Sequence, residues 1–198
     1  ALLTVPDRVL PELAHALAAH HPEREGIPVL HTSGAMSTDV LAPLHARGYV
    51  VGSFFPLQTV PHAVPGARLF DGAGIVVSGE RDAAIAGRRV ATTLGAHPIE
   101  VPAQRRAEVH AASLIVSNGI AGLIAIAEDL VARVGVDEEV ARAAMLRLAE
   151  GSIDGITRYG PTRGVTGPVA EGDVEAVALH LRALPPELRA LYREVGRS

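Results

Sequence analysis

The sequence contains no cysteine and no tryptophan, and only three tyrosines and three phenylalanines. Without cysteine the chain has no disulfide, no thiolate ligand for zinc and no thiol nucleophile. With aromatic residues at 3%, a stacking surface for single-stranded nucleic acid is not expected. Eighteen basic residues stand against 22 acidic ones, and no stretch forms a basic stripe, so we expect no nucleic-acid partner.

What remains is an aliphatic chain of ordinary size. Hydrophobic residues make up 48% and charged residues 20% of the 198 residues, which is the composition of a packed globular protein. The longest uncharged stretch, residues 111–127, contains serine, asparagine and glycine and is shorter than the roughly 20 apolar residues that a membrane span needs. We interpret it as a buried helix, with no membrane as partner. The lack of cysteine fits a reducing compartment, and we expect a cytoplasmic protein.

The start of the chain is unusual. The first residues, Ala1–Val5, already form an apolar, strand-like run, with no initiator methionine and no signal-peptide pattern. A strand that is buried from its first residue suggests that sequence upstream of it has been removed.

The first hundred residues alternate short apolar runs with amphipathic segments. The runs suit strands covered on both faces; they are Ala1–Val5, Pro28–His31, Tyr49–Phe55, Gly74–Ser78 and Pro98–Val101. Between them we predict helices capped by Asp7 and by Ser37, the second ending before Gly48, and a third over residues 81–94 followed by Gly95 as a left-handed cap. This alternation predicts an α/β layer with a mostly parallel sheet.

From about residue 103 the pattern changes to helical periodicity. Apolar residues recur at steps of three and four from Val109 to Val134, which predicts one long helix. Further helices are expected after Asp137, Asp173 and Pro186. We therefore predict two domains, residues 1–102 with the sheet and residues 103–198 all helical.

Two polar segments follow predicted strands. His31-Thr32-Ser33-Gly34 lies at the carboxyl end of one strand, where open α/β sheets bind ligands and where helix amides favour anions. The segment from Ser53 to Thr59 follows the next strand and offers an amide and two hydroxyls. The alternatives, an ordinary capped turn and an ordinary polar loop, remain open.

A third group of polar residues lies on the long helix. Arg106, His110 and Ser117 fall on roughly one face, and Asn118 is turned about 100° further round. Polar residues in an apolar helix need partners or a ligand-lined cleft. A structural role for His110 is the alternative.

Several familiar motifs are missing. Gly72-Ala73-Gly74 precedes a predicted strand, whereas a phosphate-binding loop follows one. No Gly-x-Ser-x-Gly element is present, so Ser33 is not expected to be a hydrolase nucleophile. The nine histidines show no pairing typical of metal ligands, and we expect no metal site.

Taken together, four segments resemble the DUF2520 family in their order along the chain. They are His31-Thr32-Ser33-Gly34-Ala35, Phe55-Pro56-Leu57-Gln58-Thr59, His110-Ala111-Ala112 with Ser117-Asn118, and Thr166-Gly167-Pro168 with Gly172-Asp173. The resemblance covers nearly the whole chain. It implies a Rossmann-like NAD(P)-binding domain followed by a helical domain like the carboxyl-terminal one of 6-phosphogluconate dehydrogenase. The layout is also similar to pyrroline-5-carboxylate and ketopantoate reductases.

The resemblance implies hydride transfer between NADP or NAD and a small carbonyl or imine compound, bound in a cleft between the two halves. Cofactor-binding residues would then be Val5, Pro6, Asp7, His31, Ser33 and Gly34. Substrate-binding residues would be Pro56, Gln58, Thr59 and Ser117. Catalytic residues would be His110, Asn118 and Arg106. His110 would donate a proton, because histidine is the one residue type among these that exchanges a proton near neutral pH. Asn118 would orient the substrate, and Arg106 would hold an anionic group.

The chain departs from the family in three ways. The glycine-rich first βαβ unit of the family would precede Ala1, Phe55 stands where the family often has histidine, and Arg106 stands where it often has lysine. Arginine effectively cannot lose its proton, so Arg106 is suited to bind a carboxylate and not to act as an acid or base. The missing phosphate loop and Arg106 favour an alternative function, a non-catalytic dimeric binding or regulatory module with the reductase fold.

The long helix is rich in small residues, with Gly119 and Gly122 in its interior. Glycine in a helix costs about 1 kcal/mol relative to alanine, so a close approach of another backbone or a ligand is expected there. We predict a homodimer built mainly from residues 103–198, with Gly119 or Gly122 near the helix crossing. Packing within the chain against a helix over residues 138–156 is the alternative.

Overall fold

The computed structural model describes residues 1–60, 67–164 and 166–197. The chain divides into two compact units, Ala1–Ile120 and Ala121–Ser198, called here the first and the second unit. The division falls inside the long helix α4 (Arg106–Ala132). The last strand ends at Glu100, and every later element of the described chain is helical. A domain boundary at residues 102–103 stays a prediction.

The first unit contains a five-stranded sheet in the order β1-β2-β3-β4-β5. The strands are β1 (Leu2–Leu3), β2 (Pro28–His31), β3 (Val50–Leu57), β4 (Gly74–Gly79) and β5 (His97–Glu100). Neighbouring strands run parallel except for β3 and β4, which are antiparallel. Leu3 pairs with His31, and His31 with Ser53. The predicted mostly parallel α/β sheet is confirmed.

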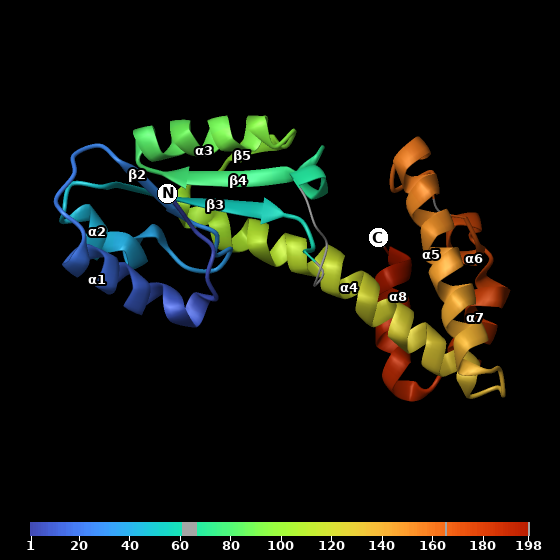
Figure 1. Ribbon diagram of the computed structural model, residues 1–198. Helices are drawn as coiled ribbons and strands as arrows, with labels where there is room; N and C mark the ends of the chain where they lie inside the picture. Colours follow the sequence, from blue (N-terminus) through green and yellow to red (C-terminus); the bar gives the residue numbers. More distant parts are fainter. Residues whose placement is uncertain (61–66, 165, 198) are drawn as a thin grey trace. The chain divides into compact units, whose positions relative to one another are not determined.

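Helices cover both faces of this sheet. The helices α1 (Leu10–His20) and α2 (Ala42–His45) lie on one face, and α3 (Arg81–Thr93) lies on the other (Figure 1). Each face has its own apolar core, with Leu41 fully buried in the first and Ile75 in the second. Full burial of a side chain of this size contributes about 2 kcal/mol to stability. The short 3₁₀ turns are Asp7–Val9, Thr38–Leu41, Ala67–Phe70 and Ala103–Arg105.

The predicted helix caps have different outcomes. Ser37 accepts a hydrogen bond from the amide of Asp39, and Gly95 has a φ of 74°, as predicted for caps. The prediction that Asp7 caps a helix is wrong. Asp7 lies inside the first 3₁₀ turn, and its carboxylate instead accepts a hydrogen bond from the hydroxyl of Ser33.

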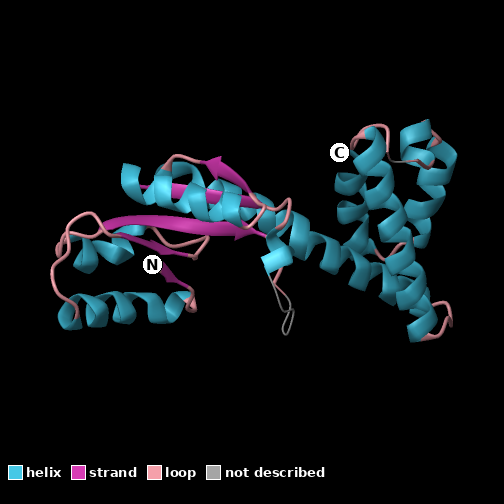
Figure 2. Ribbon diagram, turned by 45° about the horizontal axis from the view of Figure 1, so that its top comes forward, coloured by secondary structure: helices cyan, strands magenta, loops and turns pink. Residues whose placement is uncertain are grey.

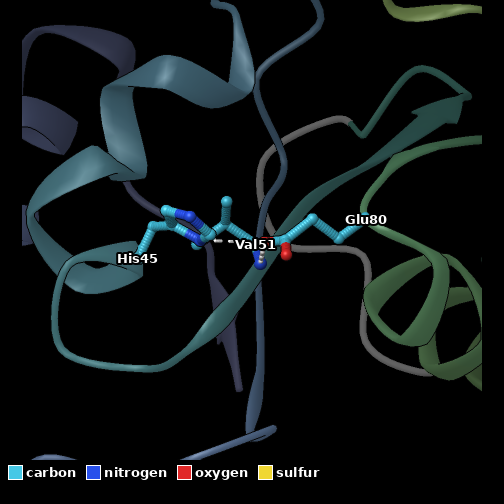
Figure 3. Close-up of polar contacts among 3 residues, drawn as sticks. All are labelled: His45, Val51 and Glu80. Carbon is cyan, nitrogen blue, oxygen red and sulfur yellow. Dashed lines mark hydrogen bonds and ion pairs between the residues drawn. The ribbon is translucent and has the colours of Figure 1, made fainter.

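Glu80 lies at the end of the sheet where β3 begins and links three elements there. Its Oε1 accepts a hydrogen bond from the amide of Val51 over 2.7 Å and lies 3.2 Å from Nδ1 of His45 (Figure 3). Glu80 directly follows β4, so this carboxylate joins the end of β4 to the start of β3 and the end of α2. The neighbouring Gly79 has a φ of 121°, and a Cβ there would lie 2.4 Å from the Cα of Gly52, so only glycine fits.

In the described part of the second unit, every regular element is a helix, and loops join the helices (Figure 2). It contains the rest of α4, followed by α5 (Glu138–Tyr159), α6 (Pro168–Glu171), α7 (Val174–Ala183), a 3₁₀ turn (Pro186–Leu188) and α8 (Arg189–Arg197). Asp137 and Asp173 accept hydrogen bonds from amides in the first turns of α5 and α7. The caps predicted at these two residues are confirmed.

The expectation that residues 111–127 form a buried helix is wrong for the single chain. Arg106 is the only residue of α4 with a buried side chain, while Ile115 and Val116 are 74% and 63% exposed. By length and composition alone, residues 103–132 are long and apolar enough to cross a membrane. One such helix is weak evidence of a membrane span, because core helices of soluble proteins pass the same test. In the described part of the second unit only Ala141 is buried, and its other apolar side chains are half-buried or exposed. A cytoplasmic location stays a prediction.

Candidate functional site

The first unit brings several of the predicted site residues to one edge of its sheet. Because β1 and β2 are parallel and Leu3 pairs with His31, the loops that follow these strands leave the sheet side by side. The amide of Thr32 donates to the carbonyl of Leu3, which continues the ladder past the end of β2. Carboxyl ends of parallel strands are where open α/β folds bind their ligands.

Ser33 joins the two loops. Its hydroxyl donates to Oδ2 of Asp7 over 2.8 Å, and its Oγ accepts the amides of Ala35 and Met36 at 3.2 and 2.9 Å. A hydroxyl has one proton and two lone pairs, so Ser33 has no capacity left for a ligand. The carboxylate of Asp7 is exposed, whereas Ser33 is buried. Ser33 therefore shapes the loop and orients Asp7.

Arg106 holds the same loop from the first turn of α4. Its Nη2 donates to the carbonyl of Ser33 over 2.8 Å, and its Nη1 donates to the carbonyl of Met36 over 2.6 Å. Arg106 is 5% exposed, and burial lowers its pKa. Among the described residues no carboxylate forms an ion pair with it. The terminal nitrogens expected to hold an anionic group are instead engaged with the backbone.

His31 is the last residue of β2, directly before this loop, and is fully buried. Neither of its ring nitrogens has a hydrogen-bond partner among the described residues. Burial and, second, the positive charge of Arg106 lower the pKa of His31 to about 4, and Asp7 opposes this in part. The imidazole is therefore neutral at physiological pH, and it has no exposed surface with which to meet a ligand. We call Asp7, His31, Ser33 and Arg106 the loop cluster.

His110 follows Arg106 by one turn of α4 and contacts the sheet through its ring. Its imidazole meets the ring of Phe55 edge to face, with centroids 5.2 Å apart and planes at 80°. A Cβ on Gly34 would lie 2.8 Å from Cδ2 of His110 and from Cε2 and Cζ of Phe55. Gly34 is thus needed for the packing of these two rings, a different reason from the cofactor contact predicted for it.

The remaining predicted residues are exposed or half-buried. Gln58 and Thr59 are exposed after the end of β3, and Ser117 and Asn118 are exposed on α4. Ser117 donates its hydroxyl to Oδ1 of Asn118 over 3.2 Å. Of the others, Pro6 is exposed, while Val5 and Pro56 are half-buried. None of these seven residues has a hydrogen bond to the loop cluster in the described part of the chain.

Two features of the site escape sequence reasoning. The carbonyls of Ser33 and Met36 hold Arg106, and backbone groups carry no sequence signal. The ring of Phe55 holds His110, although the sequence pattern indicates only that Phe55 is an apolar residue of a strand. The one available signal is the pair Arg106 and His110, which are polar at a spacing of four on an apolar helix. As for metals, the described residues contain no group of three or more His, Asp or Glu able to hold an ion.

Comparisons with known proteins agree on the family and the fold. A model of a domain of unknown function, DUF2520, matches residues 73–198, and a Rossmann-like domain model matches residues 1–56. Among curated proteins, none matches this chain.

Solved structures with similar folds come from several organisms. A protein from Thermotoga maritima has a TM-score of 0.79 at 20% identity, covering 99% of this chain and 74% of that one. A Bacteroides fragilis protein, provisionally assigned as an NADP oxidoreductase, has a TM-score of 0.74 at 21% identity, with 99% and 73% covered. Plasmodium falciparum pyrroline carboxylate reductase with NADP bound has 0.64 at 10% identity, with 99% and 75% covered. At these identities the likeness shows a fold shared with Rossmann-type oxidoreductases.

Proposed function

Because the chain belongs to the DUF2520 family, we propose that it carries the nicotinamide-binding side of an oxidoreductase that uses NADP or NAD. Its substrate class is a small carbonyl or imine compound, which is reduced by hydride transfer. The observation that carries the proposal is the exposed carboxylate of Asp7, held by Ser33 at the carboxyl edge of β1 and β2. An anchored acceptor at this edge is what a ribose hydroxyl or a carboxamide group needs.

The topology of the first unit supports the proposal that it binds the nicotinamide half of the cofactor. Dinucleotide-binding folds consist of two β-α-β-α-β halves, each of which binds one mononucleotide. The parallel strands β1, β2 and β3 with α1 and α2 between them make one such half. In the family the glycine-rich half, which binds the pyrophosphate, comes first in the chain. The half seen here would then hold the nicotinamide nucleotide.

The residues at the carboxyl ends of β1 and β2 divide into those that would contact the nicotinamide nucleotide and those that would not. The bound cofactor would supply the hydride. Asp7 would accept hydrogen bonds from its polar groups, next to Val5, Pro6 and the loop of residues 32–35. His31, Ser33 and Arg106 would not touch it and would fix the loop from beneath, because all three are buried.

The substrate would be handled by polar groups of the same unit. A ring nitrogen of His110 would hold the proton that the reduced carbonyl or imine atom takes up. The exposed side chains of Gln58, Thr59, Ser117 and Asn118 would orient the substrate, beside Pro56. For Arg106 we replace the anion-holding role by a positioning role, because its two terminal nitrogens bind carbonyl oxygens.

A non-catalytic binding module is the second candidate. The burial of Arg106 and the saturated hydroxyl of Ser33 favour it, because they remove one polar group expected to hold an anionic group and one expected to bind the cofactor. Titration of NADH and NADPH separates the two candidates. It is applied to this chain and to a longer chain in which a glycine-rich βαβ unit precedes Ala1. Binding of either cofactor by the longer chain supports the reductase, and binding of neither rejects it.

We also propose a homodimer formed through α4 and α5. Large apolar side chains on both helices are exposed, among them Ile115, Val116, Leu148 and Ile153. Apart from the adjoining residues and backbone of α4 itself, no atom of the described residues lies within 4 Å of a Cβ built on Gly119 or Gly122, so no other described element makes the close approach expected there. A helical unit whose described residues include one that is buried gains its core by association, and a second copy is the partner that offers the same apolar faces.

A further inference from the structure

The ring of His110 is held without hydrogen bonds. Its nitrogens have no hydrogen-bond partner among the described residues, and its ring contact is with the half-buried Phe55. A histidine that transfers a proton is usually oriented by a hydrogen bond from its second nitrogen, which also fixes its tautomer. Here the orientation has to come from packing, and both nitrogens stay available to a ligand.

Three chain segments meet at this ring. Phe55 comes from β3, Gly34 from the loop after β2, and His110 from the second turn of α4. A Cβ at Gly34 would lie only 2.8 Å from atoms of both rings, so both rings reach the backbone there. Gly34 is absent from the glycines with positive φ. Space, and not backbone conformation, therefore excludes a larger residue at this position.

The backbone beneath His110 is fixed to the same loop. Arg106, one turn earlier, donates to the carbonyls of Ser33 and Met36, which flank Gly34. In addition, the hydroxyl of Ser113 donates to the carbonyl of His110 over 2.7 Å. With the helix held at Arg106, the remaining freedom of His110 is rotation of its side chain, and the rings and Gly34 restrict that rotation.

We propose that Phe55 and Gly34 are positioning residues that hold the imidazole of His110 in one orientation. The inference rests on the proposed function, in which His110 gives a proton to the substrate. A pre-oriented proton donor keeps its geometry before the substrate arrives, so less ordering remains for the reaction itself.

The test is nuclear magnetic resonance of the full chain labelled in its histidine rings, without cofactor. In the unchanged protein we expect a rigid Cδ2–H bond of His110, with an order parameter near the ~0.85 of ordered backbone. A cross-peak between this proton and the Hα protons of Gly34 is also expected. Phe55→Leu should lower the order parameter and weaken the cross-peak, whereas Phe55→Tyr, which keeps the ring, should preserve both.

The matched control is Phe54→Leu. Phe54 is the neighbouring residue, is 3% exposed and packs in the core on the other face of the sheet. This variant loses stability by the same chemical change and should leave the signals of His110 unaltered. As a second probe, Gly34→Ala should displace both rings and shift the His110 signals. Equal order parameters for His110 in the unchanged protein and in Phe55→Leu overturn the proposal. That result is independent of cofactor binding, so it is distinguishable from failure of the reductase function.

Discussion

Ser33 and Asp7 are joined by a hydrogen bond of 2.8 Å between loops that follow two neighbouring parallel strands. The same Oγ accepts two amides of its own loop, so one buried hydroxyl fixes the loop and orients an exposed carboxylate. The carboxyl ends of β1 and β2 therefore carry an ordered loop and an oriented carboxylate that can hold a ligand.

Removal of the Ser33 hydroxyl tests how much its hydrogen bonds stabilise the fold. Ser33→Ala leaves two amides and a carboxylate without their partner, and we expect it to lower the free energy of unfolding by about 1–3 kcal/mol. Urea denaturation gives the value. Ser152→Ala is the control, because the hydroxyl of Ser152 makes an exposed bond to Leu148 within α5. If Ser33→Ala lowers the free energy of unfolding no more than Ser152→Ala does, the hydrogen bonds of Ser33 add no stability beyond that of an exposed helix hydroxyl.

Buried His31 predicts a dependence of stability on pH. Its pKa is about 4 in the folded protein and 6.5 in the unfolded chain, so between these values only the unfolded state binds the proton. The contribution is fully present above pH 6.5 and is lost as the pH falls toward 4. From pH 7 to 4.5 the loss attributable to His31 should be about 2 kcal/mol.

The measurement compares the unchanged protein with His31→Gln by urea denaturation across this pH range. The variant should lack the His31 part of the decline, while His15→Gln, on the exposed side of α1, should keep it. Parallel curves for the unchanged protein and His31→Gln would contradict a neutral, buried His31.

Arg106 is expected to act as a clamp. Arg106→Met removes both donors from the carbonyls of Ser33 and Met36, and we expect a loss of about 2–4 kcal/mol in the free energy of unfolding. Arg106→Lys should recover only part of it, since an ammonium group lacks the planar fork that reaches two acceptors. Arg105→Met is the matched control, because Arg105 is exposed and pairs only with Glu108. Its effect should stay within about 0.5 kcal/mol.

The dimer proposal is tested by sedimentation velocity. Gly122→Leu places a bulky side chain where a close helix crossing is proposed, and it should shift the protein toward monomer. Ala19→Leu, which enlarges an exposed side chain of α1 in the first unit, should leave the assembly unchanged. If the unchanged chain sediments as a monomer at high micromolar concentration, the proposal is wrong.

Strands and helices of this chain follow from local patterns in the sequence. The run from Pro28 to His31 is a strand with the predicted bounds, and the capping role of Asp137 follows from its position before an amphipathic segment. The interior of the site does not follow, because it depends on contacts between distant residues. Asp7 has the residue type and position of a helix cap, yet its carboxylate is taken by a serine 26 residues away. The exposure of Ile115 on α4 is also invisible to periodicity, which indicates an apolar face but not what covers it.

The most direct test of the central proposal uses reduced nicotinamide mononucleotide, the half of the cofactor that the parallel strands β1 to β3 are proposed to hold. Amide signals of the isotope-labelled chain are followed during titration to millimolar concentrations. We predict saturable shifts at Asp7, Thr32 and Gly34, with none at Glu80 on the opposite edge, and their loss in Asp7→Ala. Absence of shifts at these amides, or equal shifts at both edges, would contradict the proposal.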